Sequence, residues 1–327
     1  MDSTHFKYSR EINLSKISFR GLSVVDDRII WASGSKGTIA KSVDGGNSFT
    51  FMQLKGFEKS DFRDIEAFDN KTAIVMSSGT PAFILKTIDG GISWQETYKN
   101  TDTSYFLDAM DFWDIDNGII IGDPIDNHFV LLTTQNGGLK WDQIDTSNTP
   151  VSLNGEALFA ASGTSLKCHT QLGELMFVTG GNYSRLFGGS ISQKNIKWKS
   201  FPIPIVQGNS SQGAFSFAYN DSALIVVGGD YLNDTAHSKN SCAQYIEPKR
   251  LHKGFDKLID DVKGYRSCIE RVNTGEFVAC GTSGVDYYRN KHWKTISNVS
   301  FNVVKKAKKG SAVFLAGNKG KIGKLVR

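Results

Sequence analysis

The sequence predicts an all-β protein, a seven-bladed β-propeller of four-stranded blades that forms a single domain over residues 1–327. Three observations lead to this prediction. A strand-like run that ends in glycine recurs seven times, Asp-Gly and Asn-Gly turns recur between strands, and no segment of ten residues shows a helical period. With 39% hydrophobic residues and 21 phenylalanines, the chain can build a large core, which excludes general disorder.

The glycine-ended runs are continuous and rich in β-branched residues, as expected for strands buried on both faces. They occupy residues 29–34, 73–79, 118–122, 175–180, 224–228, 277–281 and 312–317. A second run, with an aromatic residue near its start, precedes most of them and is assigned to the innermost strand of each blade. In blades four and five this run is less regular, and we place it around 156–159 and 215–217.

These repeats divide the chain into blades. The expected bounds are 19–57, 61–100, 105–147, 155–204, 213–257, 264–297 and 300–327. The last blade is one strand short, while residues 6–17 supply an unpaired strand at the other end of the chain. We therefore expect the N-terminal strand to complete the last blade, which would close the ring and leave no open sheet edge.

Three turns follow the pattern Ser/Thr-x-Asp-x-Gly-x-x-Trp/Phe of the Asp-box, or BNR repeat, although the third has asparagine at the acidic position. We expect Asp44, Asp89 and Asn136 to stabilise their hairpins by accepting hydrogen bonds from nearby backbone N–H groups. Beyond the boxes, residues 106–113, 122–124 and 155–162 resemble the photosystem II assembly/stability factor propellers and their bacterial relatives.

The resemblance implies a non-catalytic scaffold that binds another protein, as an assembly or stability factor does. It also implies export to a periplasm, a lumen or the cell surface, although the residues that follow Met1 lack the basic and apolar segments of a signal peptide. No apolar run is long enough to predict a membrane-spanning helix. We expect a monomer.

Relatives of this kind often carry the name oxidoreductase, but no cofactor motif supports it. No Gly-x-Gly-x-x-Gly loop opens a helix, and the six histidines are scattered singly, so we expect neither a cofactor nor a metal. Sialidases share the Asp-box, yet the Phe-Arg segments here lack the proline of the sialidase pattern Phe-Arg-Ile-Pro. A sialidase-like glycoside hydrolase or a carbohydrate-binding propeller therefore stays as the alternative to the scaffold.

Charged residues cluster at one predicted face of the ring. In a propeller, the start of each innermost strand and the end of the next strand reach the same face, which we call the mouth. The residues at or near such positions are Arg20, Arg63, Arg266, Asp108, Asp123, Glu156 and Asp230. Arginine forks favour carboxylates and phosphates, so the mouth would bind an anionic group or an acidic peptide, unless its acids and bases only neutralise each other.

The C-terminal part of the chain is strongly basic. The net charge is +5, and residues 289–327 contain eleven lysines or arginines and no acidic residue. Lys305, Lys306, Lys308 and Lys309 surround the turn after the innermost strand of the last blade, which we place opposite the mouth. This basic flank is either a surface for an acidic protein or a solvated edge. Nucleic acid is not expected, because no aromatic residues are interleaved with the lysines.

The four cysteines form no Cys-x-x-Cys pair, which excludes zinc ribbons and thioredoxin-like sites. Cys268 and Cys280 flank a turn at residues 273–276 and are expected to face each other across a hairpin. The sequence leaves open whether they form a disulfide.

Overall fold

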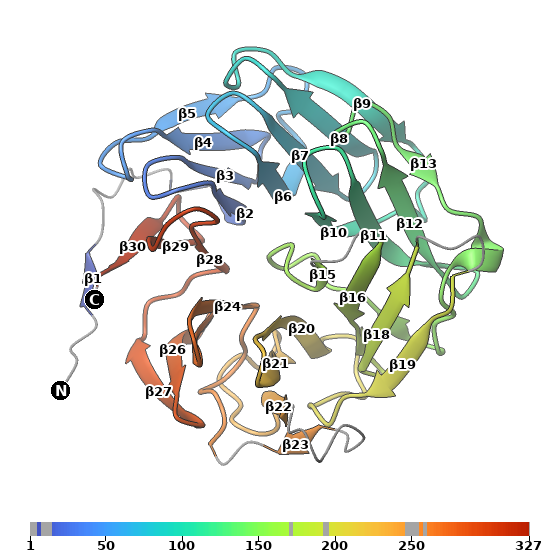
Figure 1. Cartoon of the computed structure of the whole chain (residues 1–327), viewed down its shortest axis with the longest axis vertical. Coiled ribbons are helices and arrows are strands. Elements are labelled where there is room, and N and C mark those ends of the chain that lie inside the picture. Colours follow the sequence, from blue (N-terminus) through green and yellow to red (C-terminus); the bar gives the residue numbers. More distant parts are fainter. Residues whose placement is uncertain are drawn as a thin grey trace.

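The computed structural model describes residues 5–7, 15–169, 173–191, 196–245, 255–257 and 260–326. Its strands form seven antiparallel sheets, and Figure 1 shows these sheets arranged as the blades of a ring. The predicted seven-bladed propeller is confirmed. Among the described residues, the model contains no helix that is long and apolar enough to span a membrane.

Each of the first three blades has four strands, ordered from the axis to the rim as they follow in the chain. Blade 1 contains β2 (Phe19–Val24), β3 (Ile30–Gly34), β4 (Thr38–Ser42) and β5 (Thr50–Gln53). Blade 2 contains β6 (Asp61–Ala67), β7 (Ala73–Ser78), β8 (Ala82–Thr87) and β9 (Gln95–Asn100). Blade 3 contains β10 (Leu107–Phe112), β11 (Gly118–Ile125), β12 (His128–Thr134) and β13 (Asp142–Gln143), followed by the 3-10 helix η1 (Thr146–Asn148).

The remaining blades follow the same order, with additions in blades 5 and 7. Blade 4 contains β15 (Leu166–Cys168), β16 (Glu174–Val178), β18 (Arg185–Ser190) and β19 (Lys199–Pro202). Blade 5 contains β20 (Gln212–Tyr219), β21 (Ala223–Asp230), β22 (Ser241–Tyr245) and β23 (Asp256–Lys257). Blade 6 contains β24 (Cys268–Asn273), β25 (Glu276–Gly281), β26 (Gly284–Arg289) and β27 (His292–Ser297). Blade 7 contains β28 (Val303–Lys306), β29 (Val313–Ala316), β30 (Ile322–Val326) and β1 (His5–Lys7).

The N-terminal strand completes the last blade, as predicted. Strand β1 pairs antiparallel with β30, with His5 opposite Val326 and Lys7 opposite Lys324. Residues 8–14 of the expected strand lie outside the described part of the chain. The Phe19 N–H also donates to the Gly317 carbonyl at 3.1 Å, which joins the inner strand of blade 1 to the end of the second strand of blade 7.

The innermost strand of blade 4 was wrongly placed around 156–159. It is β15, whereas Glu156 and Ala157 form a short strand, β14, that pairs with β17 (Gly180–Gly181). Strand β17 then pairs with β20, which extends the sheet of blade 5 to six strands. Glycines permit this junction, because a Cβ atom on Gly213 would lie 2.3 Å from the Cα atom of Gly180.

The core lies between neighbouring blades, where apolar faces of adjacent sheets pack together. Trp31 of blade 1 is fully buried, and its ring contacts Trp94 of blade 2 edge-on at a centroid distance of 6.4 Å. The ammonium group of Lys41 donates to the Gly90 carbonyl at 3.1 Å, and Lys86 donates to the Gly137 carbonyl at 2.7 Å. Each of these lysines therefore ties its blade to the Asp-box turn of the next blade.

Each Asp-box side chain folds the turn that contains it. Asp44 accepts hydrogen bonds from the Ser48 N–H at 3.0 Å and from the Ser48 and Ser42 hydroxyls at 2.6 and 2.7 Å. In the third box, Asn136 Oδ1 accepts from the Lys140 N–H at 3.0 Å, so a neutral amide replaces the carboxylate without loss of the bond.

We predict that acid opens the first two boxes but not the third. Hydrogen bonds from Ser48 and Ser93 lower the pKa of Asp44 and of Asp89 from 3.8 to about 2. A depressed folded-state pKa stabilises the turn above pH 4, and this stabilisation disappears as the pH falls towards 2. Amide hydrogen exchange should show Ser48 and Ser93 losing protection over that range, while Lys140 keeps its protection. Equal loss at all three amides would contradict the prediction.

Candidate functional site

A segment of blade 4, residues 158–165, lies near the axis of the ring; we call it the central segment. The Ala160 carbonyl accepts a hydrogen bond from Arg63 of blade 2 at 3.3 Å, and the Ser162 hydroxyl donates to the Ser267 carbonyl at the start of blade 6 at 2.8 Å. Blades 2 and 6 are not neighbours, so a segment that touches both must lie near the axis. Figure 1 shows the chain before β15 reaching towards the centre of the ring.

Gly163 allows the central segment to fit. Its φ angle is +67°, and a Cβ atom there would lie 2.2 Å from the carboxyl carbon of Asp64 on β6. Asp64 is buried and accepts hydrogen bonds from the Ile65 and Met110 N–H groups, each at 2.8 Å. Burial raises the pKa of Asp64 to about 8, so this carboxyl is largely protonated at neutral pH.

Two arginines lie together at the mouth, on the inner strands of blades 1 and 2. Arg63 pairs with Asp61 at 2.8 Å and lies over the ring of Phe106. Arg20 is partly buried, and burial together with the charge of Arg63 lowers its pKa. Within the described chain, Arg20 makes no hydrogen bond and no ion pair. Arg63 therefore has an ion-pair partner in Asp61, whereas Arg20 has none among the described residues.

Two acids from blade 3, Asp108 and Asp123, lie beside Arg63. The Asp108 carboxyl is fully buried, and neither of its oxygens meets a described donor at full hydrogen-bond geometry. Burial, followed by the neighbouring Asp123, raises its pKa well above the ordinary value. Burial also raises the pKa of Asp123 to about 6, although its Oδ1 accepts from the Leu158 N–H at 2.8 Å. Burial therefore disfavours the charged form of Asp108, whereas Asp123 is largely ionised at neutral pH.

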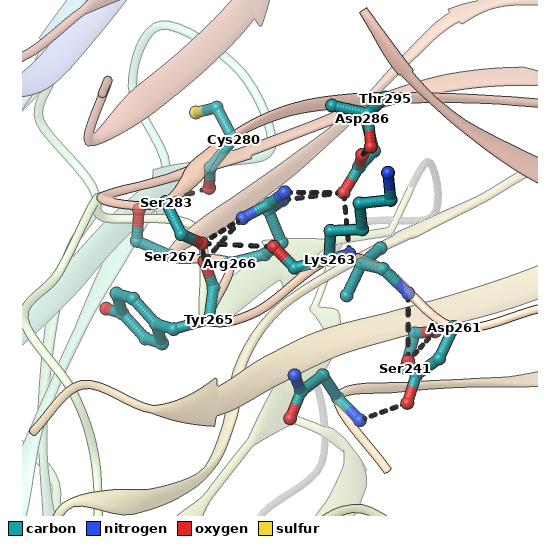
Figure 2. Close-up of polar contacts among 12 residues, drawn as sticks. Ser241, Asp261, Lys263, Tyr265, Arg266, Ser267, Cys280, Ser283, Asp286 and Thr295 are labelled. Atoms are coloured by element: carbon teal, nitrogen blue, oxygen red, sulfur yellow. Dashed lines mark hydrogen bonds and ion pairs between the residues drawn. The ribbon is translucent and has the colours of Figure 1, made fainter. Parts of the chain in front are cut away.

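Arg266 does not reach the mouth, contrary to the sequence-based expectation. Its side chain is fully buried and pairs with Asp286 of the same blade at 2.6 Å. Its Nη1 also donates to the Tyr265 carbonyl at 2.9 Å and to the Ser283 hydroxyl at 2.6 Å. Figure 2 shows the guanidinium group held between Asp286 and Ser283. A carboxylate on the third strand of the blade thus binds the arginine inside its own sheet.

Glu156 and Asp230 also have local partners. Glu156 is buried, forms an ion pair with Arg185 and accepts from the Thr179 hydroxyl at 2.5 Å. Asp230 accepts from the Gln212 amide at 3.1 Å and from the Leu232 N–H at 3.0 Å, which shapes the turn after β21. Among the seven predicted mouth residues, Arg63 acts on the charge of Arg20, and Arg63 and Asp123 both act on the charge of Asp108.

An aromatic wall beside Arg20 was missed by the sequence reasoning. Phe159 of the central segment stacks on Phe215 at a centroid distance of 3.9 Å, and Tyr265 meets Phe215 edge-on at 4.7 Å. Tyr231 contacts both phenylalanines at 6.3 Å and is 46% exposed. Tyr265 could have been found from its position before the innermost strand of blade 6. The place of Phe159 depends on the path of the central segment.

Two of the four lysines predicted as a basic flank have acidic neighbours on other blades. Lys305 belongs to β28, and the acids whose charges act on its ammonium group, Glu270, Asp64 and Asp111, lie on the inner strands of three other blades. Lys308 forms an ion pair with Glu66 of blade 2 and donates to the Ala67 carbonyl at 2.8 Å.

The backbone explains this difference, because the turn after β28 packs under blade 1. The N–H groups of Lys308 and Lys309 donate to the carbonyls of Val24 and Val25, at 2.9 and 3.0 Å. This path carries the Lys308 side chain across to blade 2. Lys308 and Lys309 are exposed, Lys305 and Lys306 are partly exposed, and Lys308 is held against blade 2 by its ion pair with Glu66.

Comparisons with known proteins support the resemblance seen in the sequence. The model of the family described as photosynthesis system II assembly factor YCF48 matches residues 59–178. No curated protein sequence matches this chain.

Three solved structures share the fold. A structure titled YCF48 bound to D1 peptide is 13% identical over 100% of this chain and 96% of its own length, with a TM-score of 0.67. YCF48 from Cyanidioschyzon merolae is 14% identical over 98% of both chains, with a TM-score of 0.64. The WD40 propeller domain of Doa1 is 12% identical over 99% of this chain and 97% of its own, also with a TM-score of 0.64. The resemblance to the assembly-factor propellers is confirmed, and these identities establish a common fold.

We predict that Arg266 stabilises the fold without contributing to binding. Replacing it in an Arg266→Met variant leaves Asp286 buried without its counter-charge, which should lower the free energy of unfolding by about 3–5 kcal/mol. The double variant Arg266→Met/Asp286→Leu removes both charges and should recover much of this loss. Urea unfolding of the three proteins measures the effect. If Arg266→Met unfolds at the wild-type midpoint, the ion pair is not a stabilising element of blade 6.

Proposed function

We propose that this chain is a non-catalytic propeller that binds a carboxylate-bearing peptide segment of a partner protein at the mouth. The observation that supports this proposal is Arg20, which lies beside Arg63 and has no ion-pair partner within the described ranges. A ligand carboxylate would supply the missing counter-charge and relieve the repulsion between the two guanidinium groups. A hydrogen bond to a charged group contributes about 1.5–3 kcal/mol, which is enough to make this contact decisive.

The aromatic wall makes a peptide a better ligand than a free anion. Tyr231 is 46% exposed, and Leu232, the next residue, is 78% exposed. Beside two arginines, these side chains offer apolar contacts to residues that flank the bound carboxylate. Aromatic and arginine side chains together are typical of the residues that dominate binding energy in protein interfaces.

The comparisons agree with this class of ligand. One YCF48 structure is titled as bound to D1 peptide, and the matching family model is named for photosystem II assembly factors. We propose by analogy that this chain assists the assembly or stability of a protein complex. We also propose that it works in an exported compartment, as its resemblance to this family suggests; cell fractionation of the tagged full-length protein tests that location.

A direct test measures binding of fluorescently labelled D1 peptide, the ligand named in the solved complex, by fluorescence anisotropy. Arg20→Met and Arg63→Met should each weaken binding at least tenfold, because each removes a charge-assisted contact. Arg28→Met is the matched control, since Arg28 is exposed and its backbone contacts an Asp-box turn. Raising the salt concentration should weaken the wild-type complex and affect the variants less.

A second peptide tests whether the mouth is the binding site even if the D1 peptide is not the partner of this chain. An acidic peptide with alternating glutamate and phenylalanine residues should bind the wild type and lose affinity in the same two variants. If neither peptide binds, or if Arg28→Met weakens binding as much as Arg20→Met, the mouth is not the binding site.

The carboxyl pair Asp108 and Asp123 favours a second candidate, a glycoside hydrolase. Burial raises the pKa of Asp108 more strongly than that of Asp123, and the acid and base of such enzymes also differ in pKa. The buried position of Asp108 under the central segment argues against it. Turnover of aryl-glycosides or sialosides that an Asp123→Asn variant loses while it stays folded would replace the scaffold proposal with this one.

A further inference from the structure

A thiol pair lies where blade 6 meets blade 7 and the central segment. Cys268 on β24 and Cys280 on β25 are directly opposite each other in the hairpin register. Both thiols are free and fully buried, and Cys280 donates a hydrogen bond to the Cys268 sulfur. The expectation that these residues face each other is therefore met, with no disulfide between them.

The surroundings of Cys268 stabilise a negative charge on its sulfur. The Val304 N–H donates to Sγ at 3.4 Å, and the Thr164 hydroxyl donates at 3.5 Å. The ammonium group of Lys305 lies near enough to act on the thiol. Although burial raises the pKa of Cys268, the hydrogen bonds and the Lys305 charge lower it to about 6. Cys280 differs, because burial and its bond to Cys268 raise its pKa.

We propose that Cys268 and Cys280 form a hydroperoxide-sensitive thiol pair, in which Cys268 is the nucleophile and Cys280 is the resolving thiol. The Cys268 thiolate attacks one oxygen of hydrogen peroxide, the O–O bond breaks, and the departing hydroxide takes a proton to become water. The Cys280 thiol then attacks the sulfenic sulfur, the S–O bond breaks, and a second water leaves as the disulfide forms. Two thiols are oxidised and one peroxide is reduced to two waters.

Oxidation would also change how the central segment is held. Cys268 Sγ donates to the Val304 carbonyl at 3.3 Å and accepts from Thr164, which belongs to the central segment. A disulfide removes the thiol hydrogen and turns the sulfur towards Cys280. The pair thus links the redox state of the chain to the segment whose other end contacts Arg63 at the mouth.

The other two cysteines provide internal controls. Cys168 is more exposed than Cys268, but burial and the nearby Asp111 and Glu66 raise its pKa. Cys242 is buried on β22, and burial raises its pKa as well. If exposure controlled oxidation, Cys168 would react first; if thiolate character and a facing partner control it, Cys268 and Cys280 react first.

The experiment exposes the folded full-length protein to hydrogen peroxide, alkylates the remaining thiols and maps the tryptic peptides by mass spectrometry. Cys268 lies in peptide 267–271 and Cys280 in peptide 272–289, so a disulfide joins two separate peptides. We expect this cross-link to form before Cys168 or Cys242 is lost. Earlier oxidation of Cys168, or a cross-link that appears only after urea unfolding, would overturn the proposal.

Two variants test the assigned roles. In Cys280→Ser, Cys268 should accumulate as a sulfenic acid that a dimedone probe labels; no label would overturn its role as nucleophile. Lys305→Met should slow the peroxide reaction roughly tenfold, because less Cys268 is then ionised at neutral pH. Lys306→Met is the matched control, since Lys306 is the next residue on β28. Equal rates in the two lysine variants would show that the Lys305 charge does not activate the thiol.

Discussion

The contacts that the central segment makes with several blades at once set the geometry of everything near the axis. Arg63 donates to the Ala160 carbonyl, Ser162 donates to the Ser267 carbonyl, and the Thr164 and Ser216 hydroxyl oxygens lie 2.7 Å apart. The first two contacts join blade 4 to blades 2 and 6, which are not its neighbours. The third joins it to the inner strand of blade 5. These contacts add cross-links near the centre of the ring to the packing between neighbouring blades.

The same segment explains which parts of the fold the sequence could predict. Blade number, Asp-box turns and closure by the N-terminal strand follow from repeated local patterns, and the structure has all three. The innermost strand of blade 4 was misplaced because Phe159 has the aromatic signature of an inner strand but stacks on Phe215 near the axis. A local pattern does not distinguish an inner strand from a segment that packs near the axis, because the difference depends on a contact between blades.

Charge placement failed for a related reason. Arg20, Arg63 and Arg266 follow an aromatic residue in the same way, so position alone predicts one role for all three. Their fates differ because of distant partners: Asp286 holds Arg266 within blade 6, whereas Arg20 has no described acid in ion-pair contact. Lys305 and Lys308 likewise reach acids on other blades. Burying an unpaired charge is costly, so a basic side chain near the axis is expected to find a carboxylate where the ring offers one.

This reasoning makes the exception at Arg20 informative. The structure supplies counter-charges to Arg266, Arg185 and Lys308, yet Arg20 lies next to Arg63 and has no ion-pair partner among the described residues. A residue whose pKa is lowered by burial and by its neighbour contributes less stability than a paired one would. The fold tolerates that cost at a face where aromatic side chains are also exposed. Such an arrangement destabilises the unbound protein and favours a bound anion, because the ligand then supplies a counter-charge to Arg20.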